Sequence, residues 1–195
     1  RPLAAARHAG RGLAVRGRGL SAAPPLCLYA SEHAHSSVEK AAIVLGVGLD
    51  QVRKVPVDDA YRMDPTALAA AVEADRAAGR APFAVVATVG TTSTTSVDPV
   101  ASIAPVCRAH GLWLHVDAAY AGAAALLPEC AAHFAGCVQA YSFVVNPHKW
   151  LFTPLDCSAL FCRRPETLRQ ALSHVPAYLE TDRDDEVVNY MDYGL

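Results

Sequence analysis

The fold class follows from residues 83–116, which read FAVVATVGTTSTTSVDPVASIAPVCRAHGLWLHV. The two ends of this stretch, residues 83–89 and 112–116, are nearly continuous apolar runs of strand length. Between them, Asp98 followed by Pro99 predicts the start of a helix, and Gly111 predicts its end. Two buried strands connected through a helix form a β-α-β unit, which predicts parallel strands in one sheet.

The same alternation extends along the rest of the chain. Further strands are predicted at residues 26–30, 52–57, 141–145 and 158–162, and further helices at 36–45, 64–79 and 165–172. The repeated pattern predicts an α/β fold: a mainly parallel sheet with helices on both faces. Because no Pro/Gly/Ser-rich linker or internal repeat interrupts it, we expect one domain. The charged run TDRDDE at residues 181–186 predicts an exposed loop.

Composition excludes several classes of protein. The chain has 195 residues, of which 52% are hydrophobic and 18% charged, as in globular proteins that bury a core. Its 17 Lys and Arg against 19 Asp and Glu give a net charge of −2, so there is no broad basic surface for nucleic acid or an acidic membrane. No apolar run approaches the ~18 to 20 residues of a membrane-spanning helix. We therefore expect neither a nucleic-acid nor a membrane partner.

The six cysteines follow no paired spacing, which predicts reduced, mostly buried thiols in a cytoplasmic protein. Cys130, His133 and Cys137 are close in sequence, but a second ligand pair at zinc spacing is missing. We therefore expect these three side chains to pack in the core, with no metal site.

The N-terminus begins with Arg1 rather than Met, and five arginines precede the first acidic residue, Glu32. An Arg-rich, acid-poor start is typical of an organelle transit peptide. The alternative, which we favour, is that residue 1 lies in the interior of a longer chain.

Polar side chains follow four of the predicted strands, at the sheet edge where α/β proteins bind ligands. They are His35, Thr91, Thr92, Asp117, Asn146, His148 and Lys149. Taken singly, such a lysine is usually a surface charge, such an aspartate a helix cap and such a histidine a structural group. Together, a lysine for a Schiff base, an acid for a pyridinium nitrogen and a flat side chain for the ring are what pyridoxal phosphate requires.

Three motifs carry a resemblance to a known family: AHSSVEKA at residues 34–41, HVDAAYAG at 115–122 and NPHKW at 146–150. In order and spacing they resemble the group II pyridoxal-phosphate-dependent decarboxylases, most closely the aromatic-L-amino-acid decarboxylases. The resemblance runs from about Leu26 to the C-terminus, while residues 1–25 match only loosely. It implies a type I transferase-like large domain, pyridoxal 5'-phosphate as cofactor, an amino acid as substrate and a homodimer.

The resemblance also implies roles for individual residues. Lys149 would form the Schiff base, Asp117 would pair with the pyridinium nitrogen, and His35 would stack on the ring and help position the substrate carboxylate. Tyr178, in HVPAYLET, matches a mobile-loop tyrosine that donates a proton to the substrate Cα after decarboxylation. The remaining residues implied to lie near the cofactor are Thr92, Ala119, Asn146 and His148.

Two parts of the family pattern are missing from the sequence. The Gly/Ser-rich phosphate-binding segment and the N-terminal dimer region precede the matching part, and a basic helix and small C-terminal domain follow MDYGL. We therefore expect residues 1–195 to be a partial large domain that holds the lysine side of the site.

The function predicted on this basis is decarboxylation of an aromatic L-amino acid such as tyrosine, tryptophan or dopa. Histidine decarboxylases tend to have Ser in place of His148, and glutamate decarboxylases differ around the lysine. An aldehyde synthase shares the scaffold, but Tyr178 and His35 argue against it. The alternative from another class is an inactive fragment or interaction module that retains the motifs.

Overall fold

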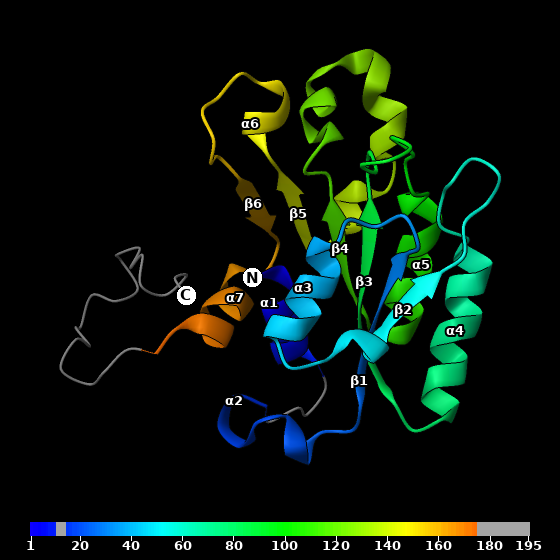
Figure 1. Cartoon of the computed structure of the whole chain (residues 1–195), viewed down its shortest axis with the longest axis vertical. Helices are drawn as coiled ribbons and strands as arrows, with labels where there is room; N and C mark the ends of the chain where they lie inside the picture. The colour runs from blue at the N-terminus through cyan, green and yellow to red at the C-terminus, as the bar shows by residue number, and fades with distance from the viewer. Residues whose placement is uncertain (11–14, 175–195) are drawn as a thin grey trace.

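The computed structural model describes residues 1–10 and 15–174, and its centre is a six-stranded sheet (Figure 1). The strand order is β2-β1-β3-β4-β5-β6. The first five strands pair in parallel, and β6 is antiparallel to β5. The strands are β1 (Leu26–Ser31), β2 (Val52–Val55), β3 (Ala81–Thr88), β4 (Trp113–Asp117), β5 (Ser142–Val145) and β6 (Ala159–Cys162).

Helices cover both faces of the sheet (Figure 1). One face packs against α1 (Pro2–Ala9), α3 (Ser37–Val44) and α7 (Pro165–Leu172), and the other against α4 (Pro65–Ala77) and α5 (Val100–His110). The shorter helices are α2 (Val15–Arg18), α6 (Pro147–Trp150), η1 (Leu20–Ala22), η2 (Leu49–Gln51), η3 (Ala121–Leu126), η4 (Pro128–Phe134) and η5 (Cys137–Gln139). The predicted fold class is confirmed. Among the described helices, none has the length and apolar character needed to cross a bilayer.

Among the predicted strands, β1, β3 and β4 lie inside the sheet and are the most buried. All six residues of β1 are buried, because β2 and β3 flank it and helices lie above and below. On β4 the burial alternates between two cores, with Leu114 in the core that includes α4 and α5 and Trp113 in the core that includes α1 and α3. The sheet therefore divides two hydrophobic layers.

The two Asp-Pro pairs behave differently from each other. Asp64, which precedes Pro65 at the start of the helix predicted over residues 64–79, caps α4, with Oδ1 accepting the backbone N–H of Thr66 at 2.7 Å. Asp98 was expected to cap α5 in the same way, and that prediction is wrong. Its carboxylate is buried and accepts the backbone N–H groups of Met63 and Thr88, both at 2.8 Å. Burial raises the pKa of the Asp98 carboxyl, which links β3 to the segment before α4 instead of capping the start of α5.

The cysteines are less buried than predicted. Among the described residues all six are free thiols, but only Cys27 and Cys107 are buried. Cys137 packs against the core, whereas His133 is exposed in η4, so the prediction of core packing is wrong for this histidine. His133 lies within a run of short helices, η3, η4 and η5.

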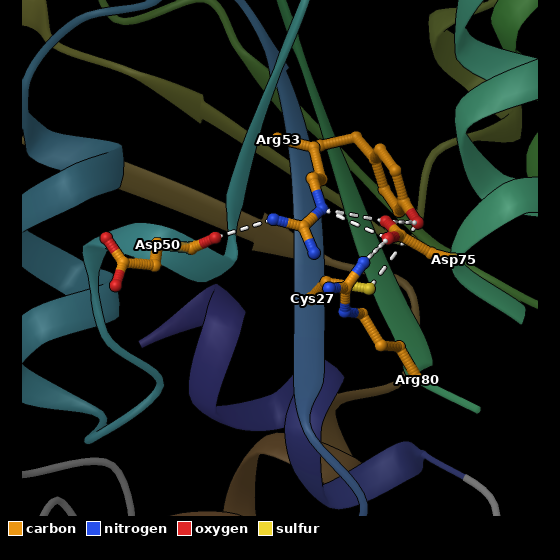
Figure 2. Close-up of polar contacts among 6 residues, drawn as sticks. Cys27, Asp50, Arg53, Asp75 and Arg80 are labelled. Carbon is orange, nitrogen blue, oxygen red and sulfur yellow. Dashed lines mark hydrogen bonds and ion pairs between the residues drawn. The ribbon is translucent and has the colours of Figure 1, made fainter. Parts of the chain in front are cut away.

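A buried carboxylate on α4, Asp75, fastens that helix to the sheet (Figure 2). Arg53 Nε donates to both its oxygens at 2.9 and 3.2 Å, the Tyr29 hydroxyl donates at 2.8 Å and Arg80 Nη1 at 2.7 Å. Burial alone raises the pKa of Asp75, but the hydrogen bonds outweigh burial and hold that pKa well below its usual value. Burial also raises the pKa of the neighbouring Cys27 thiol, to about 11. We assign this cluster a structural role, because every oxygen of the carboxylate is already bonded.

Candidate active site

A cavity of about 680 Å³ lies at the carboxyl ends of β3 and β4, on the side of the sheet that faces α1 and α3. This is the edge at which the sequence predicted a ligand site. Residues from segments far apart in the chain meet here, because the parallel strands end side by side. The sequence-predicted residues that line the cavity are His35, Thr92, Asp117, Ala119, Asn146 and Lys149.

Asp117 is the last residue of β4 and is half-buried. Its Oδ1 accepts the backbone N–H of Ala119 at 3.1 Å, which fixes the turn that leaves the strand. Within the described residues its other oxygen, Oδ2, accepts no hydrogen bond. The carboxylate therefore retains bonding capacity beside the cavity.

Small residues in the HVDAAYAG motif allow the turns around the cavity to pack closely. A Cβ on Gly122 would lie 2.7 Å from Val145 Cγ2, so only glycine permits this approach to β5. The N–H of Asn146 donates to the carbonyl of Ala119 at 3.1 Å. This bond joins the segment after Asp117 to the segment that leads into Lys149.

Lys149 lies in the short helix α6, and its side chain is exposed at the cavity. Within the described residues its amine makes no ion pair or hydrogen bond, so it is available to a ligand. Asn146 precedes the helix, and its Oδ1 accepts the Ser158 hydroxyl at 2.7 Å. Through Asn146, the segment that contains the lysine is therefore hydrogen-bonded to the residues after β4 and before β6.

His35 and Thr92 approach the cavity from loops that follow β1 and β3. The N–H of Ser37 donates to His35 Nδ1 at 3.2 Å, so the imidazole accepts a hydrogen bond at the start of α3. Thr91 is buried, and its hydroxyl contacts other hydroxyls of its own loop, which marks it as structural. Thr92 is exposed and lines the cavity.

His148, predicted to lie near the cofactor, does not line the cavity. The ring of His148 faces the loop before β6, where its Nδ1 accepts the N–H of Cys157 at 3.0 Å and lies 3.4 Å from a carboxylate oxygen of Asp156. Tyr178 lies outside the described residues.

Thr88 and His115 are among the polar residues of the cavity wall that were not predicted from the sequence. Thr88 pairs in register with Asp117, and its buried hydroxyl has no hydrogen-bond partner among the described residues. His115 is buried, and its Nδ1 lies 2.8 Å from Ser142 Oγ. The signal was strand alternation, which places His115 on the same face as Asp117.

The side chains of the cavity define the ligand they can hold. A free amine suits a carbonyl carbon, a carboxylate with a spare oxygen suits a basic ring nitrogen, and an imidazole suits a planar ring. The unsatisfied hydroxyl of Thr88 offers a further polar contact, since buried polar groups without a partner are rare. These residues fit pyridoxal phosphate.

Comparison with known proteins gives the family. The model of the pyridoxal-dependent decarboxylase conserved domain matches residues 4–195. The chain belongs to the pyridoxal-dependent decarboxylase family. The match also takes in residues 4–25, where the sequence motifs gave only a loose resemblance. The predicted resemblance is confirmed.

Individual members of the decarboxylase family agree with this assignment. The chain is 47% identical over 172 residues to the aromatic-L-amino-acid decarboxylase of Bos taurus, covering 87% of this chain and 35% of the relative. It is 40% identical over 174 residues to the phenylacetaldehyde synthase of Petunia hybrida, covering 87% and 34%. The crystal structure of Oryza sativa TDC with PLP and tryptamine matches with a TM-score of 0.88 and 38% identity, covering 97% of this chain and 39% of that one. The chain thus spans about a third of the length of these relatives.

Proposed function

We propose that this chain is the lysine-bearing part of a pyridoxal-phosphate-dependent decarboxylase that converts an aromatic L-amino acid to its amine and CO₂. The observation that carries the proposal is that Lys149 and Asp117, from different strand ends, line one cavity. The bovine relative supports an aromatic substrate.

In this proposal the residues of the cavity hold the cofactor as follows. The Lys149 amine would hold the cofactor through its aldehyde, the Asp117 carboxylate would pair with its ring nitrogen, and the His35 imidazole would lie against its ring. Thr92, Ala119 and Asn146 line the remaining space, and His148 supports the segment next to Lys149. When bound, the cofactor accepts the electron pair that the departing CO₂ leaves behind.

Asp117 has the most specific task. A pyridine nitrogen is only weakly basic, and a nearby carboxylate can raise the pKa of such a group by ~1 to 3 units. Asp117 thereby keeps the ring nitrogen protonated at neutral pH. His35 would position the substrate so that its carboxylate, rather than another substituent, is the group released.

The reaction also requires a proton at the substrate Cα. One C–C bond breaks, CO₂ leaves, and a C–H bond forms at the same carbon, with no oxidant consumed. We propose that the Tyr178 hydroxyl donates this proton. Formation of an aldehyde instead would consume O₂ and water and release ammonia and hydrogen peroxide, so the two reactions differ in measurable products.

Product analysis tests the proposal. The protein encoded by the reading frame that contains these residues would be incubated with pyridoxal phosphate and L-dopa, L-tyrosine or L-tryptophan in air. We expect one amine per CO₂ and no hydrogen peroxide. Aldehyde and hydrogen peroxide in equal amounts would instead establish the second candidate, an aldehyde synthase, which the Petunia relative supports. The absence of any turnover or cofactor absorbance would favour an inactive module.

The variant Tyr178→Phe separates the two reactions further. The ring remains and the proton donor is lost, so amine formation should fall while aldehyde and ammonia rise, with KM little changed. Amine formed at the parent rate with no aldehyde would show that another group delivers the proton.

The relatives are about two and a half times as long as this chain, and we propose that neighbouring parts of the same protein supply the phosphate-binding segment and the C-terminal domain. We also propose a cytoplasmic homodimer, which light scattering would test. Residues 1–195 expressed alone should bind pyridoxal phosphate weakly and aggregate, because open sheet edges and uncovered apolar faces promote association. A soluble monomer with tightly bound cofactor would contradict this expectation.

A further inference from the structure

A chain of buried hydrogen bonds runs below Asp117 on the cavity side of the sheet. Trp113 and His115 precede Asp117 by four and two residues on β4, so all three lie on one face of the sheet. Ser142 of β5 pairs in register with His115. Trp113 Nε1 donates to Ser142 Oγ at 2.8 Å, and the same oxygen lies 2.8 Å from His115 Nδ1. Each of these three side chains is buried.

The direction of these hydrogen bonds follows from the donors available. An indole nitrogen can only donate, so Ser142 Oγ accepts from Trp113. The Ser142 hydroxyl hydrogen then needs an acceptor, and among the described residues His115 Nδ1 is the one within reach. Ser142 therefore donates to Nδ1, which must be unprotonated. A neutral ring with a bare Nδ1 carries its hydrogen on Nε2.

The charge of His115 follows from its surroundings. Burial lowers the pKa of its imidazole to about 4, even though the Asp117 charge and a hydrogen bond with the Ser142 backbone act in the opposite direction. The ring is therefore neutral at pH 7. A charged imidazole would neutralise the Asp117 carboxylate, whereas a neutral one leaves that charge available for a ligand. His115 lines the cavity, and Nε2 makes no hydrogen bond to a described residue.

We propose that His115 is a positioning residue for Asp117: the Trp113 and Ser142 side chains fix it as the neutral Nε2–H tautomer, whose N–H dipole stabilises the ionised Asp117 carboxylate. The consequence for the cofactor rests on the proposed function. With Asp117 held ionised, the ring nitrogen of bound pyridoxal phosphate remains protonated. The chain of hydrogen bonds from Trp113 through Ser142 to His115 does not itself require that a cofactor be present.

The tautomer of His115 is tested first, without added cofactor. In the protein labelled with ¹⁵N-histidine, long-range ¹H–¹⁵N spectra should show His115 as a neutral Nε2–H ring whose shifts stay constant from pH 5.5 to 8. The resonance is assigned by its loss in His115→Asn. Ser142→Ala should release the tautomer into a mixture, and Ser142→Thr, which keeps the hydroxyl, should retain it. A protonated Nδ1 or a charged ring at pH 7 in the parent protein would overturn the proposal.

The effect on Asp117 is tested with a matched pair of variants in the cofactor-loaded protein. The amide nitrogen of His115→Gln can take the place of Nε2–H, whereas the amide of His115→Asn reaches only the Nδ1 position. The readout is the ¹⁵N shift of ring-labelled pyridoxal phosphate across pH. We expect the Gln variant to keep the ring nitrogen protonated at pH 7. In the Asn variant the pKa of that nitrogen should fall, and kcat should drop roughly tenfold with KM unchanged, the scale on which outer-shell partners act.

Two outcomes separate this proposal from the proposed function. Equal ring-nitrogen pKa values in the parent, Gln and Asn proteins would overturn the role of His115 while leaving the enzyme assignment intact. Failure of Lys149 to bind the cofactor would overturn the enzyme assignment while the tautomer measurement still stands. If both His115 variants are insoluble, Ser142→Ala provides the same readout without adding bulk.

Discussion

Asp75 and Asp117 are carboxylates on opposite faces of the same sheet, and their surroundings differ sharply. Asp75 accepts hydrogen bonds from three side chains, and its pKa is held far below the usual value. Asp117 accepts one backbone N–H and lines a cavity. Buried polar groups are normally paired. A carboxylate whose bonds are all made within the chain stabilises the fold, while one with a spare oxygen beside a cavity is able to bind a ligand.

The largest effect is expected at the cavity, from Lys149→Ala. Removing the amine should abolish the visible absorbance of bound cofactor and reduce decarboxylation to background. The melting temperature of the cofactor-free protein should be unchanged, because the amine makes no ion pair or hydrogen bond within the described residues. Absorbance spectra and CO₂ release provide the measurement. Lys40→Ala is the matched control, since this exposed lysine of α3 does not line the cavity. An unchanged spectrum in Lys149→Ala would refute the cofactor assignment.

Asp117→Asn should give the next largest effect. The amide retains an acceptor for the Ala119 N–H and loses the charge, so folding should be unaffected. Turnover should fall by about 100-fold or more, equivalent to ~2.7 kcal/mol of transition-state stabilisation. Steady-state kinetics combined with thermal melting would separate the two effects. Full turnover in this variant would reduce Asp117 to a turn-forming residue.

Asp75→Asn should have the opposite profile. The amide leaves Arg53, Arg80 and the Tyr29 hydroxyl incompletely paired, and the free energy of unfolding should fall by ~2 to 4 kcal/mol, since both arginines retain some contact with water. Below the melting transition kcat should equal that of the parent protein. Asp58→Asn is the control, because the Asp58 ion pair with Arg62 is exposed and its loss should barely change the melting temperature. A stable Asp75→Asn variant would contradict the structural role.

The pH dependence of stability should show the smallest effect. The pKa of Asp75 is lowered in the folded protein, so its contribution is present above the unfolded value of ~3.9 and is lost as pH falls through the folded value. The pKa of Asp98 is raised in the folded protein, so lowering the pH protonates Asp98 first in the folded state. This protonation favours the folded state and opposes the loss of stability at Asp75. The difference in melting temperature between the parent protein and Asp75→Asn should therefore narrow below pH 4. A constant difference down to pH 3 would disprove the linkage.

Sequence reasoning succeeded where the signal is local. The apolar runs predicted each of the six strands to within about three residues, and Asp64 and Gly111 marked helix ends correctly. The cavity residues could be predicted as a group because parallel strands end at a shared edge, which brings Asp117 and Lys149 together without knowledge of any side-chain contact.

The failures arise where a distant neighbour decides the outcome. Asp98 has the same local pattern as Asp64, but its partners are Thr88 and Met63, which lies 35 residues earlier in the chain. In the sequence, His115 is a single polar residue within an apolar strand. Its partner Ser142 belongs to β5, and local sequence does not predict this pairing. The orientation of His148 likewise depends on a loop that no helical or strand period predicts.

The position of β1 within the sheet has a consequence for synthesis on the ribosome. This strand is buried along its whole length and lies between β2, which follows it in the chain, and β3, which is made much later. After β2 is complete, the 33 residues from 56 to 88 must still be translated before β1 gains its second neighbour. At ~5 to 20 residues per second this takes roughly two to seven seconds. Throughout that interval the nascent chain carries an apolar strand with an open edge, the feature that molecular chaperones bind.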